Sequence, residues 1–336
     1  MLVNAAPQPT DEMIVAFLVE GGDEFTTGEA LSDKLGLSRG DVWKHLEALR
    51  TLGYRIENSP TKGYRLLEVP DRVSALEVAH LLNTRDLGQV FEHRESTDST
   101  HADAWALAEE GAAHGTVVIA EAQAAGRGRR GRAWSCIAGK DVALSIVLRP
   151  SGSAATAPEY TLVAAVAAAQ TLIEAGAPVA IKWPNDLVAG SQKVAGILTE
   201  LSADADGIRF LVLGLGINVN STPEEFPEAL SGTLTSLLAL RGQPVPRALF
   251  VAALLGHLEH WLDIYEEQGF EPIRTAWKAH AAHLGQEVLV RSEAQELRGV
   301  AEDLDPTGAL ILRLADGSTT RILAGDVEAV RARKGP

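Results

Sequence analysis

Apolar positions in the first 68 residues follow first the spacing of amphipathic helices and then that of a short hairpin. Thr26 followed by Glu29 is typical of a capping box, and Gly36 predicts the end of the short helix that the box begins. Ser38 predicts the start of a further helix whose apolar residues share one stripe. Helix, turn, helix and hairpin is the plan of a winged helix-turn-helix. The stripe is Val42, Leu46 and Leu49, and the predicted hairpin strands are residues 54–57 and 64–67.

Beyond a linker at residues 69–71, strand and helix patterns alternate as far as residue 283. Several apolar runs of strand length are joined by short turns that contain glycine, such as residues 188–190. Short turns join antiparallel neighbours, so the pattern favours local antiparallel pairing over a doubly wound parallel sheet, in an α+β fold. The predicted strands are residues 116–120, 142–148, 179–183, 194–201 and 208–214, and the predicted helices are residues 159–175 and 247–268.

The last 50 residues change character, because short strand-like runs follow one another without a helix between them. Turn signals at residues 305–308 and 316–317 separate the later runs. Short, evenly spaced strands are typical of a small β-barrel. The predicted strands are residues 287–291, 297–302, 310–314 and 318–323.

Composition narrows the class of protein. The 336 residues carry 45 acidic and 30 basic side chains, a formal net charge of -15, which argues against a protein that coats nucleic acid non-specifically. The one cysteine, Cys136, can form neither an intrachain disulfide nor a cysteine-rich zinc site, which fits a reducing compartment.

Asp11 and Glu12 stand where a signal peptide would need basic and then apolar residues. The most apolar helical stretch, residues 160–173, falls short of the roughly 20 residues that span a bilayer. We therefore predict a cytoplasmic protein without membrane contact.

Residues 126–132 read Gly-Arg-Gly-Arg-Arg-Gly-Arg, and we call them the glycine–arginine loop. Four guanidinium groups so close repel one another, and the glycines let the backbone approach a ligand. The loop fits an anion, because arginine gives forked hydrogen bonds to phosphate or carboxylate. Its glycines also match the dinucleotide pattern GxGxxG, but that pattern must open a helix, and here Trp134 and a new strand follow. A solvated basic loop that binds nothing is the alternative.

Two further segments bring polar side chains to the ends of strands. Lys182, Asn185 and Asp186 lie within five residues of one another, beside a tryptophan and a proline. Lys193 begins an otherwise apolar strand, where it is either a functional cation or an edge residue that extends its amine to solvent. Residues 214–220 end another apolar strand with glycines and asparagines, and a plain strand-ending turn explains them equally well.

In order and spacing, these segments closely resemble the signature blocks of biotin protein ligases. The resemblance covers most of the chain. With the predicted winged helix added, the chain is similar to the two-function subclass of this family, whose members are both ligase and repressor of the biotin operon. It rests on residues 126–134, 182–187, 193–200 and 214–218, on Asp98-Ser99-Thr100 and on Gln123.

The resemblance implies a three-part chain and a two-step reaction. A winged helix in residues 1–68 would precede a mixed-sheet catalytic domain in residues 69–283 and an SH3-like barrel in residues 284–336. Biotin and ATP would give biotinyl-5′-AMP and pyrophosphate. A lysine of the biotin carboxyl carrier protein of acetyl-CoA carboxylase would then take the biotinyl group and release AMP. Arginine, lysine and Mg²⁺ suit this chemistry, because a carboxylate that attacks a triphosphate brings two anions together.

The resemblance also implies a role for individual residues. Lys193 would bond the carboxyl oxygen of biotin, and Trp134 would pack on a ring system. Asp186 would organise either Mg²⁺ or the incoming lysine. The implied biotin set is Ser99, Thr100, His101, Gln123, Gly126, Arg127, Gly128, Arg129, Trp134 and Lys193; the nucleotide set is Arg129, Arg132, Lys182, Asn185 and Asn218; the catalytic set is Arg129, Lys182, Asp186 and Lys193.

Two places depart from the pattern of the family. His101 stands where the family usually has asparagine, and Ser135-Cys136-Ile137 replaces an aromatic-serine-proline run. Both lie at the edge of the implied ligand site, so they bear on the detail of binding and not on the class of reaction. Cys136 is expected to be a small packing residue and not a catalyst.

The charge of the first 68 residues bears on DNA binding. Eleven acids outnumber seven bases there, but all seven bases fall within residues 34–65, where three acids oppose them. This stretch is the proposed recognition helix and wing, whose side chains would face the major groove and the phosphates. The alternative is a winged helix that no longer binds an operator. Trp43 is unusual on a face that reads bases, and packing is the alternative for this one side chain. The predicted DNA contacts are Ser38, Arg39, Trp43, Lys44 and Lys62.

Three functions follow, of which we favour a ligase that also represses. It should dimerise when the adenylate fills the site, because two operator half-sites need a two-fold protein. The second is a ligase with a purely structural winged helix. The third is a transcription factor that senses biotin without ligating it, and the presence of Arg129, Lys182, Asp186 and Lys193 argues against it. Lipoate ligation on a similar fold is a related alternative, although the arginine-rich loop and Gln123 look like the biotin branch.

Overall fold

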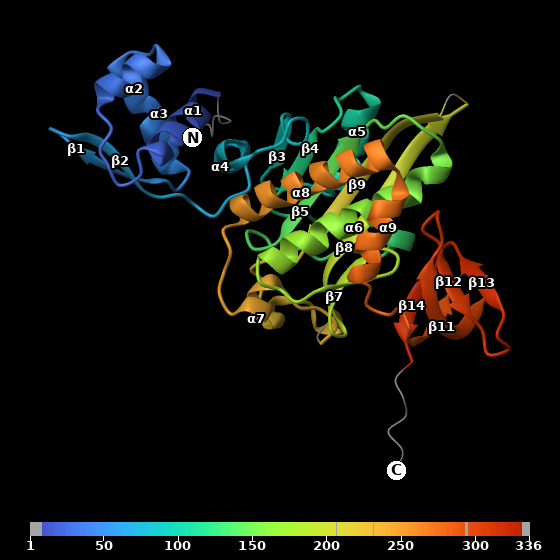
Figure 1. Cartoon of the computed structure of the whole chain (residues 1–336). Helices are drawn as coiled ribbons and strands as arrows, with labels where there is room; N and C mark the ends of the chain where they lie inside the picture. Colours follow the sequence, from blue (N-terminus) through green and yellow to red (C-terminus); the bar gives the residue numbers. More distant parts are fainter. Residues whose placement is uncertain (1–8, 206, 231, 293–294, 331–336) are drawn as a thin grey trace.

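The computed structural model describes residues 9–205, 207–230, 232–292 and 295–330 (Figure 1). At its N-terminal end, three helices precede a two-stranded antiparallel sheet, in the order expected for a winged helix-turn-helix. A separate small core fills this part, with Ile14, Leu31 and Leu46 fully buried in it. The elements are α1 Pro9–Glu20, α2 Gly28–Leu35, α3 Arg39–Thr51, β1 Arg55–Ser59 and β2 Gly63–Glu68.

Capping residues set the helix ends here, with one difference from the predicted pattern. The N-cap of α2 is Thr27, whose side chain accepts a hydrogen bond from the first turn, and not Thr26. Thr26 instead exchanges backbone hydrogen bonds with Tyr64 of β2. Thr26 is therefore paired with the wing and does not cap α2. Ser38 caps α3 and Gly36 ends α2 in the left-handed conformation, as predicted.

A seven-stranded sheet forms the middle of the molecule, in the order β3-β4-β5-β9-β8-β7-β6. The β3–β4 pair is parallel and every other neighbouring pair is antiparallel. Gly190 turns the chain between β7 and β8 at a positive φ of 59°. The predicted α+β class with local antiparallel pairing is confirmed. The strands are β3 Phe91–Arg94, β4 Val117–Ala120, β5 Val142–Leu148, β6 Ala180–Lys182, β7 Asp186–Ala189, β8 Gln192–Asp204 and β9 Gly207–Ile217.

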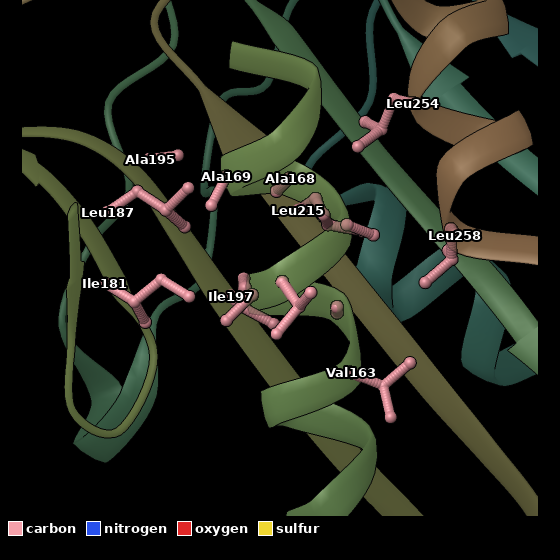
Figure 2. Packing of buried hydrophobic residues seen from close by; sticks show 14 of the residues in the cluster. Val163, Ala168, Ala169, Ile181, Leu187, Ala195, Ile197, Leu215, Leu254 and Leu258 are labelled. Atoms are coloured by element: carbon pink, nitrogen blue, oxygen red, sulfur yellow. The ribbon is translucent and has the colours of Figure 1, made fainter. Parts of the chain in front are cut away.

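Helices cover both faces of this sheet. The alanine-rich α6 packs on β6, β7, β8 and β9, with α8 and α9 beside it, and small side chains let it lie close to the strands. Figure 2 shows Val163 of α6, Ile197 of β8 and Leu258 of α8 in this layer. On the opposite face, α5 packs on β4, β5 and β9. No helix in the described ranges is long and apolar enough to cross a membrane. The helices are α4 Ala75–Val78, α5 Thr100–Glu109, α6 Ala157–Glu174, α7 Leu237–Arg241, α8 Arg247–Gln268 and α9 Phe270–Ala279.

The C-terminal part is a five-stranded antiparallel sheet in the order β13-β12-β11-β10-β14. The sequence predicted four of these strands and missed β14, which is short and follows directly after Gly325. Because β13 and β14 stand at opposite ends of the order, the described strands form a sheet, and closure into a barrel is not confirmed. The strands are β10 Glu287–Arg291, β11 Glu296–Leu304, β12 Leu310–Arg313, β13 Thr319–Ile322 and β14 Asp326–Ala329.

A buried cluster of charges holds the segment after the winged helix against the middle part. Arg247, at the start of α8, is 1% exposed and donates to the carbonyl of Asp71 and, over 2.8 Å, to Glu121 Oε2. Nearby, the Tyr54 hydroxyl of the winged helix donates to Glu77 Oε1 over 2.7 Å in a buried position. Buried partners of this kind fix the path of the linker, since breaking either would leave a buried polar group unsatisfied.

Candidate functional site

The floor of the candidate site is a patch of glycines on two neighbouring strands. Gly196 of β8 and Gly216 of β9 are partners in the sheet. A Cβ atom at Gly216 would lie 2.2 Å from Trp134 Cε2, and one at Gly196 would lie 3.1 Å from Trp134 Cζ3. Only glycine leaves room for this approach, so the indole of Trp134 rests directly on the two strands. Glycines at these positions therefore make a floor on which a flat group can lie.

The start of α5 forms one wall. Thr100 donates from its backbone N and its Oγ1 to Gln123 Oε1, over 2.8 and 3.2 Å. Its Oγ1 also lies 3.0 Å from Ser145 Oγ of β5. These bonds bring two of the predicted biotin residues together. The sequence analysis missed Ser145, for which the available signal was a single hydroxyl in an otherwise apolar strand.

Four buried polar atoms around this floor have no hydrogen-bond partner in the part of the chain that the structure describes. They are Ser99 Oγ, both ring nitrogens of His101 and Trp134 Nε1. Buried polar groups in proteins are nearly always satisfied. Such a concentration marks a place where a ligand with its own donors and acceptors would complete the missing bonds.

The glycine–arginine loop lies above this floor and is held from two sides. Arg129 Nη1 donates to Asn185 Oδ1 over 2.8 Å, which ties the loop to the segment before β7. Arg130, at a positive φ of 56°, and Arg132 both form ion pairs with Asp326 of the C-terminal sheet. The structure therefore gives three of the four arginines a partner and speaks against a freely solvated loop.

The side chain of Lys193 faces the glycine floor. It is therefore not an edge residue that merely extends its amine to solvent. Its Nζ lies 2.6 Å from Asp186 Oδ1 and 5.3 Å from the centroid of the Trp134 ring. Its backbone pairs with residues 233 and 235, which fixes the start of β8. A part-buried ammonium that touches one carboxylate and one aromatic face is a preorganised positive charge.

Two hollows meet at this point, and four side chains line both. The first lies over the glycine floor, and the second lies between the glycine–arginine loop, β7 and the C-terminal sheet. The shared side chains are Arg129, Trp134, Asn185 and Lys193. The first hollow also includes Ser99, Thr100, His101, Gln123, Arg127, Gly128 and Ser145, and the second also includes Gly128, Arg132, Lys182, Asp186, His283, Asp326 and Glu328.

Two predicted residues line neither hollow. Gly126 begins the glycine–arginine loop, and a Cβ atom there would stand 2.6 Å from the carbonyl oxygen of Trp134, so it lets the start of the loop pass close to the segment that follows it. Asn218 is fully buried, and its amide donates to the carbonyl of Thr235 over 2.9 Å. Its Oδ1 has no partner among the described residues. Both residues shape the surroundings of the site in this structure.

The second hollow suits a divalent cation held together with phosphate. Within the described ranges, no group of three or more histidine, cysteine, aspartate or glutamate side chains could hold a metal ion alone. Asp186 and Asp326 nevertheless line this hollow. Mg²⁺ commonly takes one or two carboxylates and completes its shell with phosphate oxygens and water. The donor set therefore fits Mg²⁺ bound with a nucleotide.

Cys136 is not built as a nucleophile. Burial raises the pKa of its thiol to about 12, and Asp141 adds to the effect. A nucleophilic cysteine needs the opposite shift, because the thiolate is the reactive form. The expectation that Cys136 is a packing residue agrees with this environment.

The predicted DNA contacts lie on α3 and on the wing between β1 and β2. Trp43 is 52% exposed, so it does not pack into the core. Arg39 pairs with Glu29 over 3.1 Å and Lys44 with Asp41 over 2.9 Å, all four side chains being largely exposed. Lys62 sits at the wing tip, 5.5 Å from the ring centroid of Phe25. Ser38 caps α3.

Three family models match the chain, one for each of its parts. Residues 12–65 match a family described as HTH domain, and residues 93–218 match the Biotin/lipoate A/B protein ligase family. Residues 283–329 match the Biotin protein ligase C terminal domain.

Curated relatives and a solved structure agree with these matches. The Bifunctional ligase/repressor BirA of Bacillus subtilis is 38% identical over 94% of this chain and 97% of its own length. The protein of the same name from Escherichia coli is 32% identical over 96% and 97%. The structure of a biotin protein ligase from Aquifex aeolicus in complex with biotin and ATP covers 73% of this chain and all of its own, with 28% identity and a TM-score of 0.63.

Proposed function

The chain belongs to the biotin protein ligase family, and from that premise we propose how its two joined hollows perform the reaction. The protein activates biotin with ATP and transfers it to a lysine of the biotin carboxyl carrier protein of acetyl-CoA carboxylase. One observation carries the assignment of the site: Arg129, Asn185 and Lys193 line both hollows. Biotin in the first hollow and ATP in the second therefore meet at one cationic wall.

In the first step, a carboxylate oxygen of biotin attacks the α-phosphorus of ATP, and pyrophosphate leaves with the electrons of the broken P–O bond. Lys193 exchanges Asp186 for the carboxyl oxygen and then holds the acyl-phosphate junction. Arg129, oriented by Asn185, balances charge on the phosphate, and Lys182 contacts the nucleotide. Charges already in place at the point where charge develops lower the barrier by several kcal/mol, about 10²–10³-fold for a single donor.

In the second step, the amine of the acceptor lysine attacks the acyl carbon, AMP leaves, and the new amide nitrogen loses a proton. Asp186, released from Lys193, would receive that proton if it organises the incoming lysine, which is the alternative to its holding Mg²⁺. Neither step consumes water. Trp134 and the glycine–arginine loop would cover the adenylate, a reactive mixed anhydride, and keep water from it.

Mg²⁺ would be held by Asp186 and the phosphates, and Asp326 also lines the second hollow. When bound, the ion neutralises charge on the leaving pyrophosphate. Removal of divalent cations with a chelator should stop adenylate formation while biotin still binds.

A repressor role follows from the winged helix, whose exposed contacts would reach operator DNA. Trp43 and Arg39 on α3 would face the major groove, and Lys62 at the wing tip would reach phosphate. A winged helix that lacks operator binding stays the alternative. Sheared DNA from the same source, retained with and without biotin plus ATP and then sequenced, separates the two. We expect a two-fold symmetric site, retained only when both ligands are present.

A homodimer would form through the open half of β8. Strand β7 pairs with β8 only from Gln192 to Gly196, whereas β9 pairs with β8 as far as Asp204. In the described structure, residues 198–204 therefore have a strand neighbour on one side alone. Such an edge accepts a second strand, and two copies placed edge to edge satisfy the two-fold symmetry that an operator requires. Analytical ultracentrifugation with and without biotin plus ATP tests this, and dimers should appear when the adenylate is bound.

Three further assignments belong to the same proposal. The boundaries are residues 1–68, 69–283 and 284–336, and the family matches to each part support them. The C-terminal sheet is folded as an SH3-like domain. The protein acts in the cytoplasm.

The ligase activity is tested with an isolated biotin carboxyl carrier domain, ATP, Mg²⁺ and biotin. Mass spectrometry should show one added biotinyl group on the acceptor, with AMP and pyrophosphate as products. Lipoate is the competing substrate, because one matching family includes lipoate ligases. A lipoyl addition in place of a biotinyl addition would contradict the assignment.

A further inference from the structure

His101 stands between the biotin pocket and a second, more open cleft. It belongs to the first turn of α5 and is 4% exposed. On one side it lines the first hollow, and a Cβ atom at Gly214 of the floor would lie 2.9 Å from its Nδ1. On the other side it lines a cleft with Trp105, Arg127 and Glu200. The imidazole therefore forms a wall between the two, together with Arg127, which also lines both.

Glu200 of β8 holds this wall from outside. Its Oε2 lies 2.7 Å from His101 Nε2, and its side chain is 51% exposed. The carboxylate is close enough to form an ion pair with a charged imidazole. Both ring nitrogens of His101 are buried, and neither has a hydrogen-bond partner among the described residues.

The surroundings of His101 oppose a positive charge on it. Burial lowers the pKa of the imidazole, Glu200 raises it and Arg127 lowers it further, with a net result below the usual value. Glu200 and Arg127 are the charged side chains that face the ring from β8 and from the glycine–arginine loop. The N-terminal end of α5 also disfavours a cation.

We propose that His101 is a positioning residue of the biotin pocket, held by Glu200, and that biotin binds while its imidazole is uncharged. The inference rests on the proposed biotin site. Biotin would expel the remaining water from the hollow, which makes a buried charge on the wall costlier still. Protonation of His101 and occupation of the pocket therefore oppose each other.

Calorimetric titration of biotin alone, without ATP, from about pH 5 to 8 tests this directly, since the range spans the titration of histidine. Biotin affinity should be constant at the upper end. It should weaken toward tenfold per pH unit below the pKa of His101, because binding then requires release of one proton. His101→Asn should bind biotin with an affinity that no longer varies with pH.

Glu200→Gln removes the carboxylate that favours the imidazolium, so the break in the profile should move to lower pH. His260→Asn, at an exposed position of α8, is the control and should keep the wild-type profile. A break that persists in His101→Asn, or that stays in place or rises in Glu200→Gln, would overturn the proposal. If His101→Asn does not fold, the direction of the shift in Glu200→Gln decides alone. Failure of the wild-type chain to bind biotin at any pH would instead count against the proposed biotin site.

Discussion

The winged helix and the ligand site both display clustered cations, and they hold them in opposite ways. On the winged helix, Arg39 and Lys44 are paired with neighbouring acids on an exposed surface. In the ligand site, Arg129 and Lys193 are part-buried and are fixed by an amide and a carboxylate beside Trp134. Exposed pairs contribute little and exchange readily, whereas part-buried ones are preorganised.

The difference matches what each surface has to do. A protein that releases and rebinds DNA benefits from cations whose acidic partners are easily replaced by phosphate, at little free-energy cost. A site that stabilises a short-lived charge benefits from cations that need no rearrangement. The acids near the bases of α3 therefore need not argue against DNA binding, although they make the net charge of this part negative.

Loss of Lys193 should have the largest effect and tests the comparison most severely. Lys193→Ala removes a preorganised cation from the junction of the two hollows, so adenylate formation should fall about 10²–10³-fold. Pyrophosphate release is the measurement. Lys140→Ala is the matched control, because Lys140 is paired with Glu225 over 2.6 Å away from both hollows. Equal activity of the two variants would remove the distinction between the two kinds of cation.

Glu121→Gln should have the next largest effect, on stability, because it breaks the buried cluster that holds the linker after the winged helix against the middle part. Burial alone would raise the pKa of Glu121, but His93, whose Nε2 lies 3.7 Å from Oε1, and the charge of Arg247 lower it to about 2. A lowered carboxyl pKa means that the ionised form stabilises the fold. The stabilisation by the ionised carboxylate is therefore complete above about pH 4.5 and is lost as the pH falls toward about 2.

Urea unfolding measures this contribution. At neutral pH, the free energy of unfolding should fall by about 3 kcal/mol, and between pH 4.5 and 2 the variant should depend less on pH than the wild-type chain. Glu224→Gln, at an exposed site, serves as the control. If both variants unfold alike, the cluster does not secure the linker.

Gly216→Ala should weaken biotin binding about 10- to 100-fold, the equivalent of about 1–3 kcal/mol of overpacking. The added methyl group would overlap the Trp134 ring and displace it from the floor. Gly256→Ala in α8 introduces the same methyl group with nothing within 4 Å and should leave biotin binding unchanged. Calorimetric titration compares the two. Unchanged affinity in Gly216→Ala would show that the glycine floor is dispensable.

How far the sequence predicted the fold depends on how local the signal was. The amphipathic α8 was predicted with both bounds correct, and α6 to within two residues, because apolar spacing and composition are local properties. The short strands β3, β7 and β14 were missed, and so were the helices α5 and α9. β3 and β14 are each stabilised by pairing with a strand that is distant in the chain, β3 with β4 and β14 with β10, and their own four residues carry little signal. The prediction that Thr26 caps α2 was wrong, because the backbone of Thr26 pairs with Tyr64 of the wing.

The site followed the same division. Residue types and spacing indicated the arginines, Lys182, Asp186 and Lys193 as candidates, and the resemblance implied Ser99 and Thr100. Ser145 escaped notice, because only the register of β5 against α5 brings its hydroxyl to Thr100. The tie between the glycine–arginine loop and Asp326 joins residues almost 200 positions apart, which no local pattern contains.

Lys62→Ala should have the smallest effect, and it tests the exposed cations of the winged helix. Lys62 lies at the exposed wing tip beside Phe25, so it would contact phosphate and not a base edge. Operator affinity should weaken about equally on all sequences, and the slope of log affinity against log salt should lose about one unit. Lys278→Ala, which removes a base that pairs with Asp303 far from the winged helix, should leave the slope intact. An intact slope in Lys62→Ala would mean that the wing does not touch the backbone and that α3 alone carries the contact.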